Sequence, residues 1–191
     1  MVATGGAPER ATRIRGTEPM LDIIALIYED HDWFRRHFFY LDHASTTEDL
    51  TAIWQPLGTR LDVHAEAEEV VFYPALLAAG SADDPKDETL DAIKDHNKIR
   101  DAVAEANRHP VGSEEWRKAV SVARKENGEH LDEEEREGLP DFIRNASAQQ
   151  RHDLALAWLR FYHAHPPANS PGEADLKVSD KDPDGYVEAM S

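Results

Sequence analysis

The sequence predicts an all-α protein, built as a bundle of four long helices followed by a short extra C-terminal helix. Apolar residues recur every three or four positions along most of the chain, a spacing that places them on one face of an α-helix. Residues that favour turns separate these segments at intervals that suit a bundle. At 191 residues the chain is long enough to bury a hydrophobic core in a single domain.

The first helix is predicted to begin near residues 17–19, where a threonine precedes Pro19, and to run to about Asp42. One face carries an unbroken series at alternating spacings of four and three residues: Met20, Ile24, Ile27, His31, Phe34, Phe38 and Leu41. His31 therefore occupies a position where an apolar side chain is expected.

The second helix is predicted to begin in the Ser-Thr-Thr-Glu run at residues 45–48. Its buried face is expected to carry Leu50, Ile53, Leu57, Leu61, His64, Glu68 and Val71. Pro56 is expected to kink or restart this helix, because proline removes one helical hydrogen bond. Residues 80–85 are predicted to form a loop.

The third helix is predicted from about Lys86 to Arg108, and His96 lies in its apolar series. Ser113 is expected to cap the fourth helix, whose series continues through His130 and Glu134 until residues 138–140 end it. The short extra helix, about residues 147–162, is expected to pack outside the bundle or across its end. We therefore expect a flexible leader at 1–18, the helical domain at 19–163 and a flexible tail at 164–191, which is either disordered or a loosely docked arm.

Composition excludes several classes of function. The 38 acidic residues outnumber the 21 basic ones, and the net charge of −17 argues against nucleic acid and membrane partners. The absence of cysteine excludes disulfides, thiolate catalysis, iron–sulfur clusters and cysteine-based zinc sites. With no apolar run of membrane-spanning length and no secretory signal, we expect a cytoplasmic monomer or weak oligomer whose partners are small molecules.

One motif occurs twice. A histidine is followed by glutamates at plus four and plus five and by a proline at plus ten, first as His64, Glu68, Glu69 and Pro74, then as His130, Glu134, Glu135 and Pro140. An Asp-His pair precedes each copy at nearly the same distance, Asp30-His31 in the first half and Asp95-His96 in the second. Residues four apart share one face of a helix, so each histidine and its first glutamate point the same way.

Six polar residues thus fall in positions that the helical pattern assigns to the core: His31, His64, Glu68, His96, His130 and Glu134. Burying them costs several kcal/mol unless each is paired or bound to a cation. A metal centre satisfies all six together, with two histidines for each of two ions and the two carboxylates as bridges. Imidazole and carboxylate without thiolate suit iron best, with manganese and zinc as alternatives.

Simpler interpretations apply to each feature alone. A single His-x3-Glu pair is more often a surface ion pair, and a single core histidine is more often satisfied by a hydrogen bond. The repetition in matched order favours a metal site. We expect Glu69 and Glu135 to be solvated or hydrogen-bonded to a ligand rather than ligands themselves. Asp30 and Asp95 are expected to be exposed, with a hydrogen bond to a ligand as the alternative.

On these residues, over about 20–140, the chain resembles the hemerythrin-like, or HHE cation-binding, domain family. The resemblance rests on His31, His64-x3-Glu68, His96 and His130-x3-Glu134. It implies an up-down-up-down four-helix bundle that holds two iron ions, bridged by carboxylates and by an oxo or hydroxo group. The family binds dioxygen, and relatives are implicated in oxygen or nitric oxide sensing, iron handling and peroxide chemistry.

The chain departs from the oxygen carriers of that family at two ligand positions. Their last ligand is an aspartate five residues after its histidine, whereas this chain has His-x3-Glu in both halves. The carriers have a further histidine one turn after the counterpart of His96, where this chain has Arg100, and Arg35 stands at the matching place after His31. Reversible oxygen carriage is therefore less expected than reaction with a small oxidant. The predicted function is a di-iron protein that reacts with hydrogen peroxide, with catalase-like turnover, in oxidative stress or iron homeostasis. Reversible binding or sensing of dioxygen or nitric oxide, and iron storage, are the alternatives.

Overall fold

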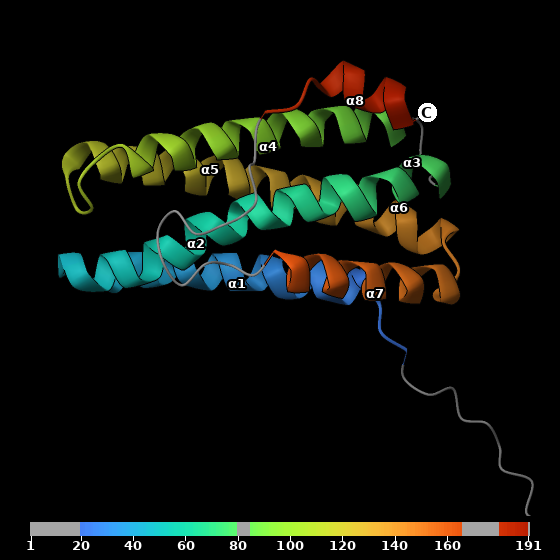
Figure 1. The fold of residues 1–191 in the computed structure, drawn as a ribbon, viewed down its shortest axis with the longest axis horizontal. Helices are drawn as coiled ribbons and strands as arrows, with labels where there is room; N and C mark the ends of the chain where they lie inside the picture. Colours follow the sequence, from blue (N-terminus) through green and yellow to red (C-terminus); the bar gives the residue numbers. More distant parts are fainter. Residues whose placement is uncertain (1–19, 80–84, 166–179, 191) are drawn as a thin grey trace, which may run out of the picture.

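A computed structural model describes residues 20–79, 85–165 and 180–190 and confirms the all-α prediction (Figure 1). Four long helical rods run antiparallel to one another and form the up-down-up-down bundle. The rods are α1 (Ile23–His43), the continuous run of α2 (Thr47–Ala67), the π-helix η1 (Glu68–Phe72) and α3 (Tyr73–Ala79), then α4 (Pro85–Asn107) and α5 (Glu114–Arg136).

Three shorter helices lie outside this bundle. They are α6 (Gly138–Asn145), α7 (Ala148–Ala164) and α8 (Pro183–Met190). The predicted short extra helix corresponds to α7, which Ser147 and Gln150 cap reciprocally and which packs against α1 and α2 (Figure 1). Helix α8 lies along α4. Within the described ranges, every helix is too short or too polar to cross a membrane.

The first helix begins later than the sequence suggested. Asp22 is its N-cap, and the Asp22 side chain accepts a hydrogen bond of 3.1 Å from the backbone N–H of Ile24. Met20 precedes the helix and is 45% exposed, so its predicted place in the buried series is wrong. The predicted flexible leader, residues 1–18, lies outside the described residues.

The second rod contains an irregular turn at an unexpected place. Helix α2 continues through Pro56, and the interruption comes instead at η1, where the N–H of Tyr73 donates to the carbonyl of Glu68, five residues back. Pro74 follows directly. It has no N–H to donate, and in a regular helix its ring would clash with the carbonyl group four residues earlier. A π turn accommodates both effects, and such turns are common at functional sites.

The C-terminal region also differs from expectation. Residues 164 and 165 belong to the end of α7, and residues 166–179 and 191 lie outside the described part of the chain. Residues 180–190, predicted as tail, instead pack against the bundle through Tyr186 and the buried Val187. Two apolar side chains in an acidic segment are too weak a pattern to reveal this contact from sequence.

The hydrophobic core is divided into two clusters. One is centred on Phe34, Trp54 and Trp116, and the other contains Phe72 and Phe142. Along α1, residue 27 belongs to the second cluster and residue 34 to the first, and His31 lies between them. A buried polar layer therefore separates the two clusters at the middle of the bundle.

Candidate metal centre

The six side chains predicted as ligands meet in this polar layer, and all six are buried. Each long rod contributes to the layer, because the predicted ligands lie on the face of each helix that points into the bundle. Helix α1 supplies His31, α2 and η1 supply His64 and Glu68, α4 supplies His96, and α5 supplies His130 and Glu134.

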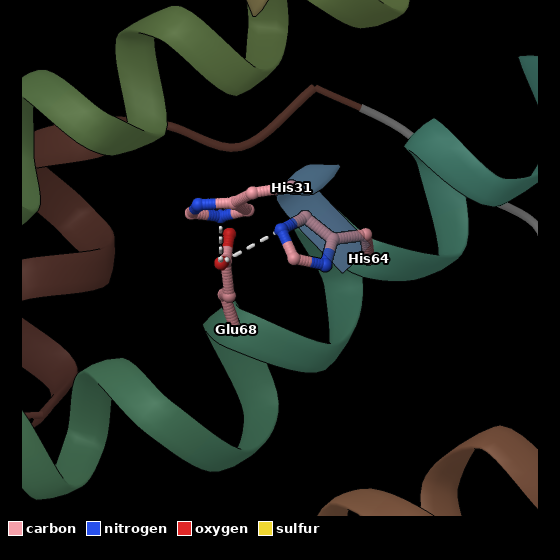
Figure 2. Close-up of side chains that lie close together, drawn as sticks. All are labelled: His31, His64 and Glu68. Atoms are coloured by element: carbon pink, nitrogen blue, oxygen red, sulfur yellow. Dashed lines mark ion pairs between the residues drawn. The ribbon is translucent and has the colours of Figure 1, made fainter. Parts of the chain in front are cut away.

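Glu68 lies at the middle of the group. Its Oε1 atom is 2.9 Å from Nε2 of His64 and 3.9 Å from Nε2 of His31 (Figure 2). Its Oε2 atom is 3.1 Å from Nε2 of His96 and 3.7 Å from Nε2 of His130. Each carboxylate oxygen therefore faces a different pair of imidazoles, and within each resulting three-residue group the ligand atoms lie within 4.8 Å of one another.

Glu134 approaches from the fourth rod. Its Oε2 atom is 3.3 Å from Nε2 of His31. Both of its carboxylate oxygens, Nε2 of His31, Nε2 of His64 and Oε1 of Glu68 are buried and have no hydrogen-bond partner within the described part of the chain. Unsatisfied buried polar atoms are costly, and a cation among them would satisfy all five. The donor set of nitrogen and oxygen atoms fits a metal ion.

Carboxylates hold the outer ring nitrogens of three of the four histidines. The three Nδ1···O distances are 2.8 Å for His31 with Glu135, 3.1 Å for His64 with Asp30, and 2.8 Å for His96 with Glu69. A carboxylate that accepts the Nδ1 proton leaves the Nε2 lone pair facing the centre, which is the usual arrangement around a metal-binding histidine. The three imidazoles are thus already oriented as ligands.

The expected exposure of Asp30 is wrong. Asp30 is 2% exposed, and its carboxylate also pairs with Arg60 and accepts a hydrogen bond from the hydroxyl of Tyr162 on α7. Helix α7 covers a position that the helical pattern of α1 alone leaves open to solvent. Its counterpart Asp95 is partly exposed and pairs with Lys98 at 2.7 Å.

Arg100, at the place of the carriers' further histidine, and Arg35, at the matching place after His31, both face the supporting carboxylates. Nη2 of Arg100 is 2.8 Å from Oε1 of Glu69, and Nη1 of Arg35 is 2.9 Å from Oε1 of Glu135. Each arginine lies four residues after a histidine and pairs with the carboxylate that holds that histidine. Of the two roles expected for Glu69 and Glu135, the structure shows the hydrogen bond to a predicted ligand. Each of these glutamates holds a histidine of the other half of the repeat.

Tyr73 belongs to the site and was missed by sequence reasoning. Its hydroxyl lies 3.4 Å from both Oε2 of Glu68 and Nε2 of His96, and its ring stacks on His96 with centroids 5.6 Å apart. In a regular helix a residue five positions after Glu68 would point about 140° away. The extra residue in the π turn returns Tyr73 toward the centre, and the following proline was the available signal.

A cavity of about 150 Å³ leads to one side of the centre. Its buried lining includes Tyr73, His130 and Glu134, and its remaining lining is mainly acidic: Asp87, Glu88, Asp91, Asp95, Glu133 and Glu137. On the other side, α7 closes the centre, because the ring of Trp158 lies 5.5 Å from that of His64. Access to the centre is therefore from the side of His130.

Without a metal, the site balances its charges by holding protons. Burial would lower the pKa of His64, but Glu68 and Asp30 raise it to about 9. Burial would raise the pKa of Glu68, but His64, His130 and His31 hold it well below its ordinary value. An ionised carboxylate among protonated imidazoles occupies the layer in this state, and a metal ion would replace protons.

A family model described as the hemerythrin HHE cation binding domain matches residues 22–142. The matched range contains all six predicted ligands, Tyr73 and the three supporting carboxylates, and it ends within α6. Helices α7 and α8 lie beyond it. No curated protein and no solved structure matches the chain significantly.

Proposed function

The chain belongs to the hemerythrin HHE cation-binding family, and on that basis we propose that it holds two iron ions and reacts with hydrogen peroxide. In this proposal His31 and His64 bind one ion, His96 and His130 bind the other, and Glu68 and Glu134 bridge them. The observation that carries the proposal is the set of five buried ligand atoms that face one another between the two core clusters and form no hydrogen bond within the described part of the chain. Bound iron would supply the redox chemistry that converts two molecules of peroxide into dioxygen and two of water.

The nature of the ligands supports iron over the other candidate metals. Imidazole and carboxylate donors, with no thiolate in the chain, suit iron, and manganese and zinc are the alternatives. The orientation of Glu68, with one oxygen toward each imidazole pair, supports its role as a bridge. Glu134 is the second bridge in the proposal because its two oxygens are buried and unpartnered.

Tyr73 gives the open side of the centre a hydrogen-bond donor. Burial, and then the charges of Glu134 and Glu68, raise the pKa of Tyr73 well above its ordinary value, so its hydroxyl keeps its proton at neutral pH. That hydroxyl lies on the cavity lining beside His96. We assign it the role of orienting a small oxidant that enters from the side of His130.

The cavity supports a neutral substrate. Its volume of about 150 Å³ suits a molecule of a few atoms, and its acidic lining disfavours anions such as superoxide. Hydrogen peroxide is small, uncharged at neutral pH and able to accept the hydrogen bond of Tyr73. The net charge of −17 likewise supports small molecules over nucleic acid or anionic membranes as partners.

The arginines support peroxide chemistry over reversible oxygen carriage. Arg100 stands where the carriers have a fifth histidine and Arg35 at the matching place after His31, and both pair with carboxylates outside the ligand set. We therefore place the protein in oxidative stress or iron homeostasis in the cytoplasm, as a monomer or weak oligomer. Reversible binding of dioxygen or nitric oxide remains the second candidate, because the same cavity admits diatomic gases.

Three measurements test the proposal. Metal analysis of protein purified from its own host is expected to give two irons per chain, with the absorption bands of a coupled ferric pair. An oxygen electrode is expected to record gas evolution when peroxide is added, and His64→Ala is expected to abolish it.

An iron-loaded protein that does not react with peroxide would contradict the proposal. A stable oxygenated spectrum that reverses under inert gas would instead support carriage, and iron uptake without either reaction would support storage.

A further inference from the structure

The segment of residues 180–190 reaches the metal centre from outside the matched family domain. Asn97, the residue after His96 on α4, binds both backbone groups of Lys181: its Nδ2 donates to the Lys181 carbonyl at 2.8 Å, and its Oδ1 accepts from the Lys181 N–H at 3.1 Å. This paired contact places the Lys181 side chain beside η1. Helix α8 then continues along α4, with Val187 buried (Figure 1).

The side chain of Lys181 ends on two glutamates. Its Nζ atom is 2.6 Å from Oε2 of Glu66 and forms a close ion pair with Oε2 of Glu69. The hydroxyl of Tyr186, on α8, donates to the backbone carbonyl of Glu69. The segment therefore contacts Glu69 at both its side chain and its backbone.

Glu69 is a support of the metal centre rather than a surface residue. It is 1% exposed, and its Oε1 atom is 2.8 Å from both Nδ1 of His96 and Nη2 of Arg100. Its Oε1 atom faces Arg100 and its Oε2 atom faces Lys181, so each carboxylate oxygen is paired with a cation. Arg100 and Lys181 together balance the charges of Glu66 and Glu69.

We propose that Lys181 is a positioning residue of the metal centre: it pairs with Glu69, the carboxylate that holds His96, and by weakening the hydrogen bond between Glu69 and His96 it raises the reduction potential of the ion that His96 binds. The inference rests on the proposed di-iron centre. The positive charge of Lys181 draws electron density from the Glu69 carboxylate, which then accepts the Nδ1 proton of His96 less strongly. His96 is consequently a weaker electron donor, and the reduced ion is favoured.

The reduction potential of the iron-loaded full-length protein tests this inference. Lys181→Met is expected to lower the potential, because Glu69 then accepts more strongly from His96, whereas Lys181→Arg, which keeps the charge, is expected to retain it. Lys118→Met removes one charge from an exposed lysine that pairs with Glu114, and it is expected to leave the potential unchanged. Thermal unfolding and Co²⁺ stoichiometry verify that each variant folds and keeps its site.

A double-mutant cycle identifies the route of the effect. In a Glu69→Gln background Lys181 keeps its pairing with Glu66 but no longer faces a carboxylate that holds His96, so adding Lys181→Met is expected to cause no further shift. An unchanged potential in Lys181→Met, or an equal shift in both backgrounds, would overturn the inference. A wild-type chain that takes up no metal would overturn both this inference and the proposed function, whereas one that loads iron but ignores peroxide would overturn the proposed function alone.

Discussion

The two halves of the repeat bring the same ligand types to the centre but are enclosed differently. In the first half, His64 is held by buried Asp30 and covered by Trp158 of α7. In the second half, His130 lines an acidic cavity, and Asp95 pairs with Lys98 near the surface. The two halves of the repeat therefore carry matched predicted ligands, but the first half is closed and the second half is accessible.

The backbone adds a second difference. Glu68 lies in a π turn, whereas Glu134 lies in regular α-helix before α5 ends at Arg136. Five residues after each glutamate stand Tyr73 and Leu139, and only the tyrosine brings a hydroxyl to the centre; Leu139 packs in the core. The first half thus supplies two anchored histidines, His31 and His64, and also the hydroxyl of Tyr73 at the open side.

The largest effect is expected from replacing Glu68, the predicted ligand that both halves share. Glu68→Ala is expected to weaken metal binding in both halves by more than about 100-fold, since each carboxylate oxygen faces a different imidazole pair. Metal stoichiometry after desalting measures this loss. Glu133→Gln is the control: Glu133 is an exposed glutamate next to Glu134 on α5, and the variant is expected to retain two ions. A Glu68→Ala variant that retains two metal ions would refute the role of Glu68 as the shared ligand.

Tyr73→Phe tests whether the hydroxyl of Tyr73 distinguishes the open side of the centre from the closed side. The variant is expected to keep its iron and to lose about 100-fold in peroxide turnover, the usual cost of one well-placed donor in a catalytic site. Oxygen evolution and metal content are measured on the same sample. Tyr28→Phe, a partly buried tyrosine on α1 beside His31, is the matched control. Equal turnover in the Tyr73→Phe and wild-type proteins would remove Tyr73 from the proposed mechanism.

The unequal aspartates give a direct comparison of the halves. Asp30→Asn is expected to weaken metal binding by about 10-fold, because the amide holds the Nδ1 proton of His64 less firmly. Asp95→Asn, at the equivalent sequence position, is expected to change the affinity much less. Competition titrations with Co²⁺ measure both variants. Equal effects at the two positions would show that burial beneath α7 does not distinguish the halves.

The smallest effect concerns pH. The pKa of His64 in the metal-free protein is about 9, above its ordinary 6.5, so its charge stabilises that state fully below pH 6.5 and the contribution is lost as pH rises through 9. Metal must displace this proton, so the affinity for Co²⁺ is expected to rise about tenfold per pH unit toward pH 9 for each proton released. Titrations at several pH values check the slope, and a flat profile would contradict it.

Much of the centre was predictable because its signals are local. A histidine at a core position of a 3.6-residue pattern, such as His31, is visible without any partner, and the two His-x3-Glu copies place their ligands on one face by spacing alone. The repetition then identified all six converging side chains. Assigning them as metal ligands remains a proposal that metal analysis will test.

The surroundings of these ligands depended on contacts between distant segments. Asp30 is buried because α7, more than a hundred residues later, brings Tyr162 to it; Lys181 reaches Glu69 because Asn97 binds its backbone. Tyr73 turns inward only because the backbone adopts a π turn before Pro74. Helical periodicity determined which residues face the centre. Tertiary packing decided which side is closed, since burial depends on what covers a helix as well as on its own pattern.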